Sequence, residues 1–378
     1  MVRSTNILVT YCLSAVLALV VSFVYLAVPG DAAEKSGAGG GITVLASGLH
    51  NPRGLNFAPD GSLWVTEAAG NGVAPSPCGV MGDGSTKCLA YTGSVTRIDV
   101  KSGQNTRIFT GLPSLISPIG NGSGGTGVHD ISFQGLGNAY VTSGFGANPL
   151  LRQTYFGAHG ENFARLLRLG PKIRLLEDLG EYEAVVNPDG NAIDANPYGL
   201  LARPGKVVYT DAGGNSLNQI AANGRITTLA VFPDRAVTLP NGSMTAVQAV
   251  PTSVVVGPNG DYYVGQLTGG PFLIGAANVY RVPARGGMPV VAYTGFTNII
   301  DIAFGPDGSL YVLEIARDAI PNFNPGRLVR IAPSGARTEI AAGILVAPGG
   351  IAVRDDGVLY VTNMSTSSTL GQVLRIEL

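Results

Sequence analysis

The chain has 378 residues, of which 54 are Gly and 24 are Pro, and only 13% are charged. Its formal net charge of -1 argues against nucleic acid as a partner, because phosphate contacts require clustered Lys and Arg. So much Gly and Pro without a collagen-like period is typical of short strands joined by tight turns. We therefore expect an all-β protein whose partners are small molecules or proteins.

The first 33 residues have the layout of a signal peptide, in which Arg3 precedes an uncharged apolar run from Ile7 to Val28. That run is also long enough to span a bilayer, so a retained N-terminal anchor is the alternative to cleavage. Membrane contact is expected only through such an uncut segment. Residues 34–41 have the composition of a flexible linker, and residues 42–378 are expected to form one domain. We expect the protein to be secreted, periplasmic or at the cell surface.

Cys78 and Cys88 are the cysteines that remain outside this leader, and both lie in a loop rich in Gly and Pro. An oxidising compartment favours their pairing. We predict a disulfide that closes a short loop and holds its shape.

Self-similar segments along the chain predict the fold. In the first of them, an alternating strand with Leu55 and Phe57 enters a Pro-Asp-Gly turn, and a second strand with Leu63 and Val65 leaves it. The matching segments are 51–65, 128–141, 197–209, 251–264, 299–312 and 348–361. Each is followed by a second pair of strands, so we predict a six-bladed β-propeller with four antiparallel strands per blade. Helical periodicity outside the leader is confined to residues 163–169.

The ends of the chain predict how the ring closes. The last repeat stops after its third strand, Gln372 to Ile376, and residues Ile42 to Ser47 are available as the fourth. A ring sealed in this way has no free sheet edge.

The connections within the repeats divide into short and long ones, which alternate and therefore lie on opposite faces. The long ones are residues 68–93, 111–127, 144–163, 181–196, 232–249 and 267–277. Long loops on a rigid scaffold are where binding sites usually occur, so we expect function on that face.

Counting along the hairpins predicts which side chains surround the channel on that face. The residue just after the second strand is polar in every repeat: Glu67, Ser143, Asp211, Gln266, Glu314 and Asn363. At the start of the first strand lie Arg53, His129, Asp130, Tyr198, Thr252 and Asp301. The same count places Asp301 opposite Glu314. We predict that these residues form the rim of a binding site.

Glu67, Asp211 and Glu314 alternate with neutral residues in this predicted ring. A Ca²⁺ ion would neutralise them, and Arg53 would neutralise one of them. The alternative is structural, with these side chains accepting hydrogen bonds from backbone amides at strand ends. No catalytic residue is assigned, because no nucleophile signature accompanies His129 and its neighbour.

Several stretches are more specific than a propeller hairpin, above all Asn196 to Leu201 and Val250 to Gly257. The others are 48–55, 92–97, 182–190, 211–215 and 297–301. In these stretches the chain resembles the ScyD/ScyE family of exported propeller proteins with NHL-like repeats. The resemblance covers nearly the whole exported portion and implies a six-bladed propeller, without implying a role in scytonemin synthesis. Gln266 departs from the family pattern, which implies Glu there.

Together these observations favour a protein outside the cytoplasm that binds a small molecule, glycan or partner protein on its long-loop face. One alternative is a calcium-dependent hydrolase of lactonase or esterase type, with the metal at the channel mouth, which rests on analogy of fold. A second alternative is a structural envelope protein.

Overall fold

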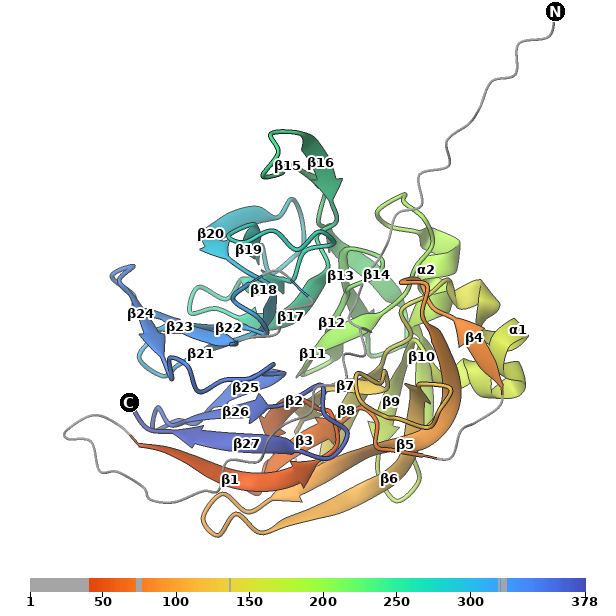
Figure 1. The fold of residues 1–378 in the computed structure, drawn as a ribbon, viewed down its shortest axis with the longest axis horizontal. Helices are drawn as coiled ribbons and strands as arrows, with labels where there is room; N and C mark the ends of the chain where they lie inside the picture. Colours follow the sequence, from red (N-terminus) through yellow and green to blue (C-terminus); the bar gives the residue numbers. More distant parts are fainter. Residues whose placement is uncertain (1–40, 73–76, 136, 319, 321–324) are drawn as a thin grey trace, which may run out of the picture.

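The computed structural model describes residues 41–72, 77–135, 137–318, 320 and 325–378. Sheets of four or five strands radiate from a central axis as the blades of a propeller (Figure 1). The prediction of a six-bladed all-β propeller is confirmed. The expected leader and all of the expected linker except Gly41 lie outside the described residues. No described helix has the length and apolar character needed to cross a membrane.

The blades follow one another along the chain, and each begins with its innermost strand. Blade 1 consists of β2 (Pro52–Phe57), β3 (Leu63–Glu67), β5 (Thr86–Ile98) and β6 (Asn105–Ile116), with β4 (Cys78–Val80) added along β5. Blade 2 consists of β7 (Val128–Gln134), β8 (Asn138–Ser143), β9 (Arg165–Leu169) and β10 (Arg174–Asp178). Blade 3 consists of β11 (Pro197–Arg203), β12 (Lys206–Asp211), β13 (Ser216–Ala221) and β14 (Ile226–Val231).

The second half of the ring repeats this arrangement. Blade 4 consists of β17 (Pro251–Val256), β18 (Tyr262–Gln266), β19 (Ala277–Val282) and β20 (Val290–Phe296). Blade 5 consists of β21 (Ile299–Phe304), β22 (Leu310–Glu314), β23 (Arg327–Ile331) and β24 (Arg337–Ile340). Blade 6 consists of β25 (Gly350–Val353), β26 (Leu359–Asn363), β27 (Gly371–Ile376) and β1 (Ile42–Leu49).

The ring closes as the sequence predicts. Strand β1 pairs antiparallel with β27, with Ile42 opposite Ile376 and Ser47 opposite Gln372. Inner strands of neighbouring blades contact one another all the way around, including β2 against β25. The first and last strands of the domain therefore share one sheet, and unfolding of either one opens the ring.

Short turns on one face follow from the Pro-Asp-Gly sequences. In the first hairpin, Gly61 has a φ of 78°, and the carboxylate of Asp60 accepts a hydrogen bond from the Ser62 amide at 3.0 Å. The same arrangement recurs at Asp307, which accepts from the Ser309 amide at 2.9 Å. Such a turn tolerates a positive φ and satisfies its own amide, so each hairpin forms locally.

Additional elements lie in the long loops. The helical periodicity at residues 163–169 is misleading, because most of that stretch forms strand β9, whose neighbours β8 and β10 supply its hydrogen bonds. The helices are α1 (Arg152–Phe156) and α2 (Leu179–Val186), accompanied by 3-10 turns at Pro149–Leu151 and Gly157–Asn162. A separate hairpin of β15 (Arg235–Thr238) and β16 (Met244–Val247) projects from the ring (Figure 1).

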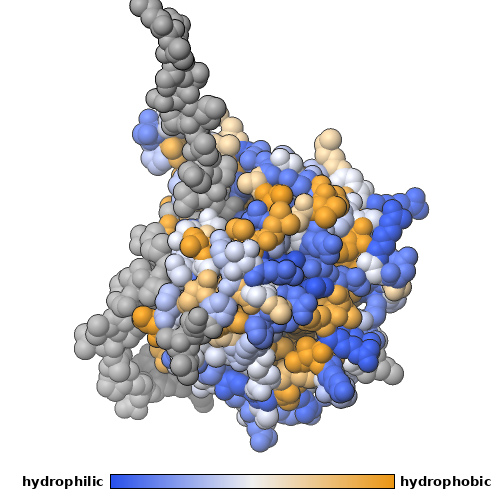
Figure 2. Space-filling model, turned by 90° about the vertical axis from the view of Figure 1, so that its right-hand side faces the viewer, coloured by the Kyte–Doolittle hydropathy of each residue, from blue (hydrophilic) through white to orange (hydrophobic). Residues whose placement is uncertain are grey.

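The predicted disulfide is confirmed, and it joins β4 to β5 through Cys78 and Cys88. Beside it, buried aromatic side chains of the blade 2 loops, including Phe145, Phe156 and Phe163, form a small core of their own. On the side of the molecule that carries α1 and α2, apolar side chains are interspersed with hydrophilic ones (Figure 2). Residues 77–93 of blade 1 and the long loop of blade 2 are therefore held by packing as well as by the disulfide.

Candidate functional site at the channel mouth

Equivalent positions of the inner strands meet at the mouth of the central channel. In the first five blades the first residue of the inner strand lies opposite the last residue of the second strand, as Pro52 lies opposite Glu67. The next residue of each inner strand lines a cavity: Arg53, His129, Tyr198, Thr252 and Ile300, together with Thr126, Asn196, Leu267 and Ile315. The cavity has a volume of about 20 Å³, which is room for one water molecule or one oxygen atom of a ligand.

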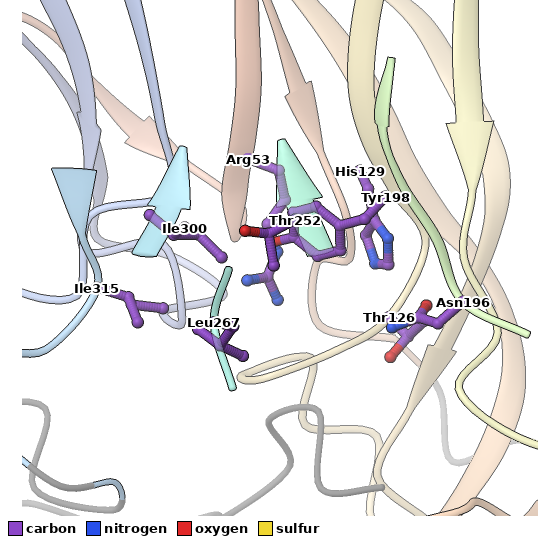
Figure 3. Close-up of a pocket in the computed structure, with 9 residues that line it drawn as sticks. All are labelled: Arg53, Thr126, His129, Asn196, Tyr198, Thr252, Leu267, Ile300 and Ile315. Atoms are coloured by element: carbon purple, nitrogen blue, oxygen red, sulfur yellow. The ribbon is translucent and has the colours of Figure 1, made fainter. Parts of the chain in front are cut away.

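Two chemically different sides face each other across this cavity. Figure 3 shows Leu267, Ile300 and Ile315 on one side and His129, Thr126 and Asn196 on the other, with Arg53 and Tyr198 between them. The polar side comes from blades 1 to 3 and the apolar side from blades 4 and 5.

A β-bulge in these hairpins determines which residues reach the cavity. In blade 5, Ile299 lies opposite Glu314, and the next pair is Asp301 with Leu313. The prediction that Asp301 lies opposite Glu314 is therefore wrong, because the turn spans three residues between Gly305 and Ser309 and shifts the count by one; the bulge then leaves Ile300 unpaired. The inserted residue, Ile300, is the one that lines the cavity.

Arg53 is a buried cation that has no anionic partner within the described part of the chain. Its side chain is almost fully enclosed, since the residue is only 4% exposed. Nη2 donates to the carbonyl oxygen of Gly125 at 3.2 Å, whereas Nε has no hydrogen-bond partner. None of the ion pairs of the described residues includes Arg53. A buried, uncompensated charge costs free energy, and a bound anion would remove that cost.

The Gly-rich loop that follows β6 brings the Gly125 carbonyl to Arg53. A Cβ at Gly122 would lie 2.1 Å from the carbonyl oxygen of Gly70, and one at Gly127 would lie 2.0 Å from that of Ala68. Only Gly permits this contact of backbone against backbone. The Asn51 side chain accepts from the Gly124 amide at 3.0 Å and fixes the loop.

Tyr198 supplies a second buried group without a partner. Its ring stacks on His129 with 4.4 Å between the centroids, and its hydroxyl lies near the Arg53 guanidinium but donates to no acceptor in the part of the chain that the structure describes. Burial raises the pKa of Tyr198, and the Arg53 guanidinium opposes that effect. The hydroxyl therefore keeps its proton at neutral pH and can donate it to a ligand.

His129 is held as a neutral ring. Its Nδ1 lies 3.1 Å from the carbonyl oxygen of Pro197, and because a carbonyl only accepts, Nδ1 carries the proton. Burial and then the charge of Arg53 lower the pKa of His129 to about 3. The absence of a side chain at Gly144 makes room for the ring, since a Cβ there would lie 2.1 Å from Cε1. The ring of His129 thus forms part of the cavity lining, and its Nε2 can accept a hydrogen bond. The ring does not carry a positive charge at neutral pH.

Asp130 and Asp301 lie one position further along their strands and link adjacent blades. Asp130 accepts from the amide of Leu200 at 2.7 Å, and Asp301 accepts from that of Ile351 at 2.8 Å. Burial raises the pKa of Asp130 to about 7. Burial also raises the pKa of Asp301, and the nearby Asp130 raises it further. The channel behind the mouth therefore carries less negative charge at neutral pH than two ionised carboxylates would give it.

The predicted ring of polar residues after the second strands does not face the cavity. Glu67, Ser143, Asp211, Gln266, Glu314 and Asn363 are all buried, and all except Ser143 accept a backbone hydrogen bond. For example, the Asn196 amide donates to Asp211 at 2.7 Å and the Thr297 amide donates to Glu314 at 2.9 Å. This is the structural role that the sequence leaves open as an alternative.

The three carboxylates predicted as calcium ligands are held separately. Glu67 forms an ion pair with Arg107 at 2.8 Å, and Glu314 lies 3.7 Å from Arg327. Among the described residues no group of three or more His, Cys, Asp or Glu side chains could hold a metal ion. The residues present therefore do not fit the calcium site that the hydrolase alternative requires.

Of the predicted rim residues, the cavity is lined by Arg53, His129, Tyr198 and Thr252. Sequence reasoning missed the remaining lining residues, which are Thr126, Asn196, Leu267, Ile300 and Ile315. A signal existed for two of them, since Leu267 and Ile315 directly follow predicted rim residues.

Comparison of the sequence with family models and with curated proteins finds no match. Solved structures are similar in fold. A putative gluconolactonase is 13% identical, with 90% of this chain and 92% of that chain covered and a TM-score of 0.51. A protein of unknown function from Bacteroides thetaiotaomicron is 8% identical, with 90% and 76% covered and a TM-score of 0.55. The PQQ-bound aldose sugar dehydrogenase of Streptomyces coelicolor is 14% identical, with 89% and 98% covered and a TM-score of 0.52. At these identities the likeness shows the fold alone.

Proposed function

We propose that this chain is a ligand-binding propeller that holds the anionic head group of a small organic acid at the mouth of its central channel. The observation that carries the proposal is the Arg53 guanidinium, which is buried at the cavity and has no carboxylate partner among the described residues. An anion placed there would accept charge-assisted hydrogen bonds from Arg53 and a further one from the Tyr198 hydroxyl.

The shape of the site limits what enters it. Because the cavity accommodates little more than one oxygen atom, one oxygen of the head group would occupy it and the rest of the ligand would lie outside it, toward the long loops. Leu267, Ile300 and Ile315 line the same cavity and would exclude water from the charged pair.

We propose further that the protein works outside the cytoplasm and is related to the ScyD/ScyE family. The disulfide between Cys78 and Cys88 supports an oxidising compartment, and the apolar leader supports export. The specific stretches at Asn196 to Leu201 and Val250 to Gly257 support the family.

Titration calorimetry of the purified full chain tests the binding proposal, with acetate and benzoate as anions and the matching amides as neutral controls. We expect Arg53→Gln to weaken anion binding by about 10- to 100-fold, the range that loss of a charged hydrogen bond implies. The control is Arg97→Gln, which removes a half-exposed cation paired with Asp60 and should leave affinity unchanged. The proposal fails if the amides bind as well as the acids, or if Arg53→Gln binds anions as the unmodified chain does.

A further inference from the structure

A second buried cation lies beside Arg53. Lys87 on β5 is only 3% exposed, and its Nζ donates to the carbonyl oxygen of Gly124 at 3.2 Å. Arg53 donates to the carbonyl oxygen of the next residue, Gly125, at the same distance. Two cations from different strands therefore hold consecutive carbonyls of one Gly-rich loop.

Lys87, like Arg53, has no carboxylate in direct contact. None of the ion pairs among the described residues includes it. Burial lowers the pKa of Lys87, the half-buried carboxylate of Asp83 opposes this, and the charge of Arg53 lowers the pKa further. The two cations therefore repel each other in a region from which water is largely excluded.

The disulfide hairpin determines where Lys87 lies. Lys87 is the neighbour of Cys88 and pairs across the hairpin with Gly79, which is the neighbour of Cys78. A Cβ at Gly79 would lie 2.4 Å from the ring of Tyr155, so this hairpin packs closely on α1. The hairpin thus fixes the backbone position from which the Lys87 side chain reaches the Gly-rich loop.

We infer that the ligand of the channel mouth is a small dianion, a phosphate monoester or a short dicarboxylate, whose negative charge is shared between Arg53 and Lys87. The inference rests on the proposed function, since it names the class of anion that the same site takes. A single negative charge would neutralise only one of the two buried cations, whereas a dianion neutralises both. Lys87 is therefore a specificity-determining residue that favours divalent over monovalent anions.

Calorimetry of the full chain at pH 7.5 tests the inference with acetate as the monoanion and with methyl phosphate and succinate as dianions. We expect the unmodified chain to bind at least one dianion about tenfold or more tightly than acetate, the effect of one additional charged contact. Comparison of the methyl phosphate and succinate titrations shows whether the site prefers a phosphate monoester or a dicarboxylate.

The decisive variant is Lys87→Gln, because its amide can still donate to the Gly124 carbonyl while the charge is gone. We expect this variant to bind methyl phosphate, succinate and acetate with affinities that agree within about threefold, so that the preference for dianions is lost. Lys87→Arg, which keeps the charge, should retain the preference, and Lys101→Gln at an exposed turn should behave as the unmodified chain.

The outcomes separate this inference from the proposed function. If Lys87→Gln keeps the preference for dianions, Lys87 serves only to hold the Gly-rich loop through its hydrogen bond to Gly124, and the inference is wrong. The inference also fails if the unmodified chain binds acetate and dianions equally, while the proposed function stands as long as acetate binding depends on Arg53. If no anion binds at all, both are wrong.

Discussion

The two halves of the channel mouth have the same backbone and different chemistry. Blades 1 to 3 place Arg53, His129 and Tyr198 at the position where blades 4 and 5 place Thr252 and Ile300. The Thr252 hydroxyl is already used, because it donates to the carbonyl oxygen of Ile299 at 2.8 Å. Among the residues that line the cavity, the unsatisfied polar atoms are therefore Arg53 Nε and the Tyr198 hydroxyl, both in blades 1 to 3.

This difference indicates that the two halves of the repeated scaffold have different roles, one in stability and one in ligand binding. Fully packed apolar side chains stabilise the ring, whereas buried donors without partners cost stability and gain it back when a ligand binds. Substitutions in the apolar half should therefore mainly lower the free energy of unfolding, and substitutions in the polar half should mainly weaken anion binding.

The largest expected effect is on stability in the apolar half. Ile315 is fully buried and belongs to the core that joins blades 5 and 6. Ile315→Ala should lower the free energy of unfolding by about 2–5 kcal/mol, since it removes buried methyl groups and leaves a cavity. Urea denaturation measures this change. Affinity for anions should fall by less than it does in Arg53→Gln, because Ile315 lines the cavity but offers the anion no charged hydrogen bond.

Arg53→Gln should show the reverse of Ile315→Ala, with weakened anion binding and nearly unchanged stability. Without ligand its free energy of unfolding should be close to that of the unmodified chain, because the variant removes an unpaired buried charge together with one hydrogen bond. A loss of anion binding in Ile315→Ala with unchanged stability would contradict the division between the two halves.

A second comparison concerns the next position along opposite inner strands. A Cβ at Gly54 in blade 1 would lie 2.8 Å from the Cα of Asp130, whereas Ser253 in blade 4 already carries a side chain there, with an unpartnered Oγ. Gly54→Ala should cost about 1–3 kcal/mol of unfolding free energy through overpacking. Ser253→Ala should change it by less than about 1 kcal/mol. Equal effects in thermal or urea unfolding would show that blades 1 and 2 are not packed more closely at this level.

The repeat explains why the scaffold could be predicted from the sequence. The Pro-Asp-Gly turns, the missing fourth strand after Ile376 and the paired cysteines are each local patterns with one structural solution, and all three predictions are confirmed. The register of the hairpin was predicted one residue out. The count treated Asp307-Gly308 as a two-residue turn, whereas Gly305 pairs with Ser309 across three residues, and the bulge then brings Ile299 opposite Glu314.

The site itself was predicted only in part, for two physical reasons. A search for polar side chains finds Arg53 and Tyr198 but not the apolar wall formed by Leu267 and Ile315. The position of a residue at a strand end also does not say which way its side chain turns. Glu314 turns to a backbone amide, and burial of Lys87 depends on how a distant loop folds over it.

A pH-dependent effect should appear beside the polar half. Glu183 on α2 is buried, and burial together with the charges of Asp211, Asp189 and Asp194 raises the pKa of Glu183 to about 8. In the unfolded chain the same group ionises near its ordinary value of about 4.3. The folded state therefore binds the proton more tightly, so the stability from this group is fully present below about pH 4 and is lost as pH rises to about 8.

Glu183→Gln should remove that dependence. Between pH 5 and pH 8.5 the variant should lose roughly 1–2 kcal/mol less unfolding free energy than the unmodified chain, as measured by urea denaturation at both values. Glu181→Gln, at an exposed position of the same helix, should follow the unmodified chain. Identical pH profiles for the two variants would mean that Glu183 is ionised in the folded protein at neutral pH.

The smallest expected effect comes from removing a single buried hydroxyl. It compares a hydroxyl at the channel mouth, which can donate to a ligand, with one elsewhere in the fold. Tyr198 in the channel mouth and Tyr280 on β19 are both buried, and neither hydroxyl has a hydrogen-bond partner among the described residues. Tyr198→Phe and Tyr280→Phe should each raise the free energy of unfolding by about 1 kcal/mol or less, because each removes an unsatisfied polar group. Only Tyr198→Phe should weaken anion binding, by roughly 3- to 10-fold, because only that hydroxyl is placed to donate to the head group. Calorimetry of both variants with the same anion decides the point, since equal affinities would remove Tyr198 from the site and leave Arg53 as its anchor.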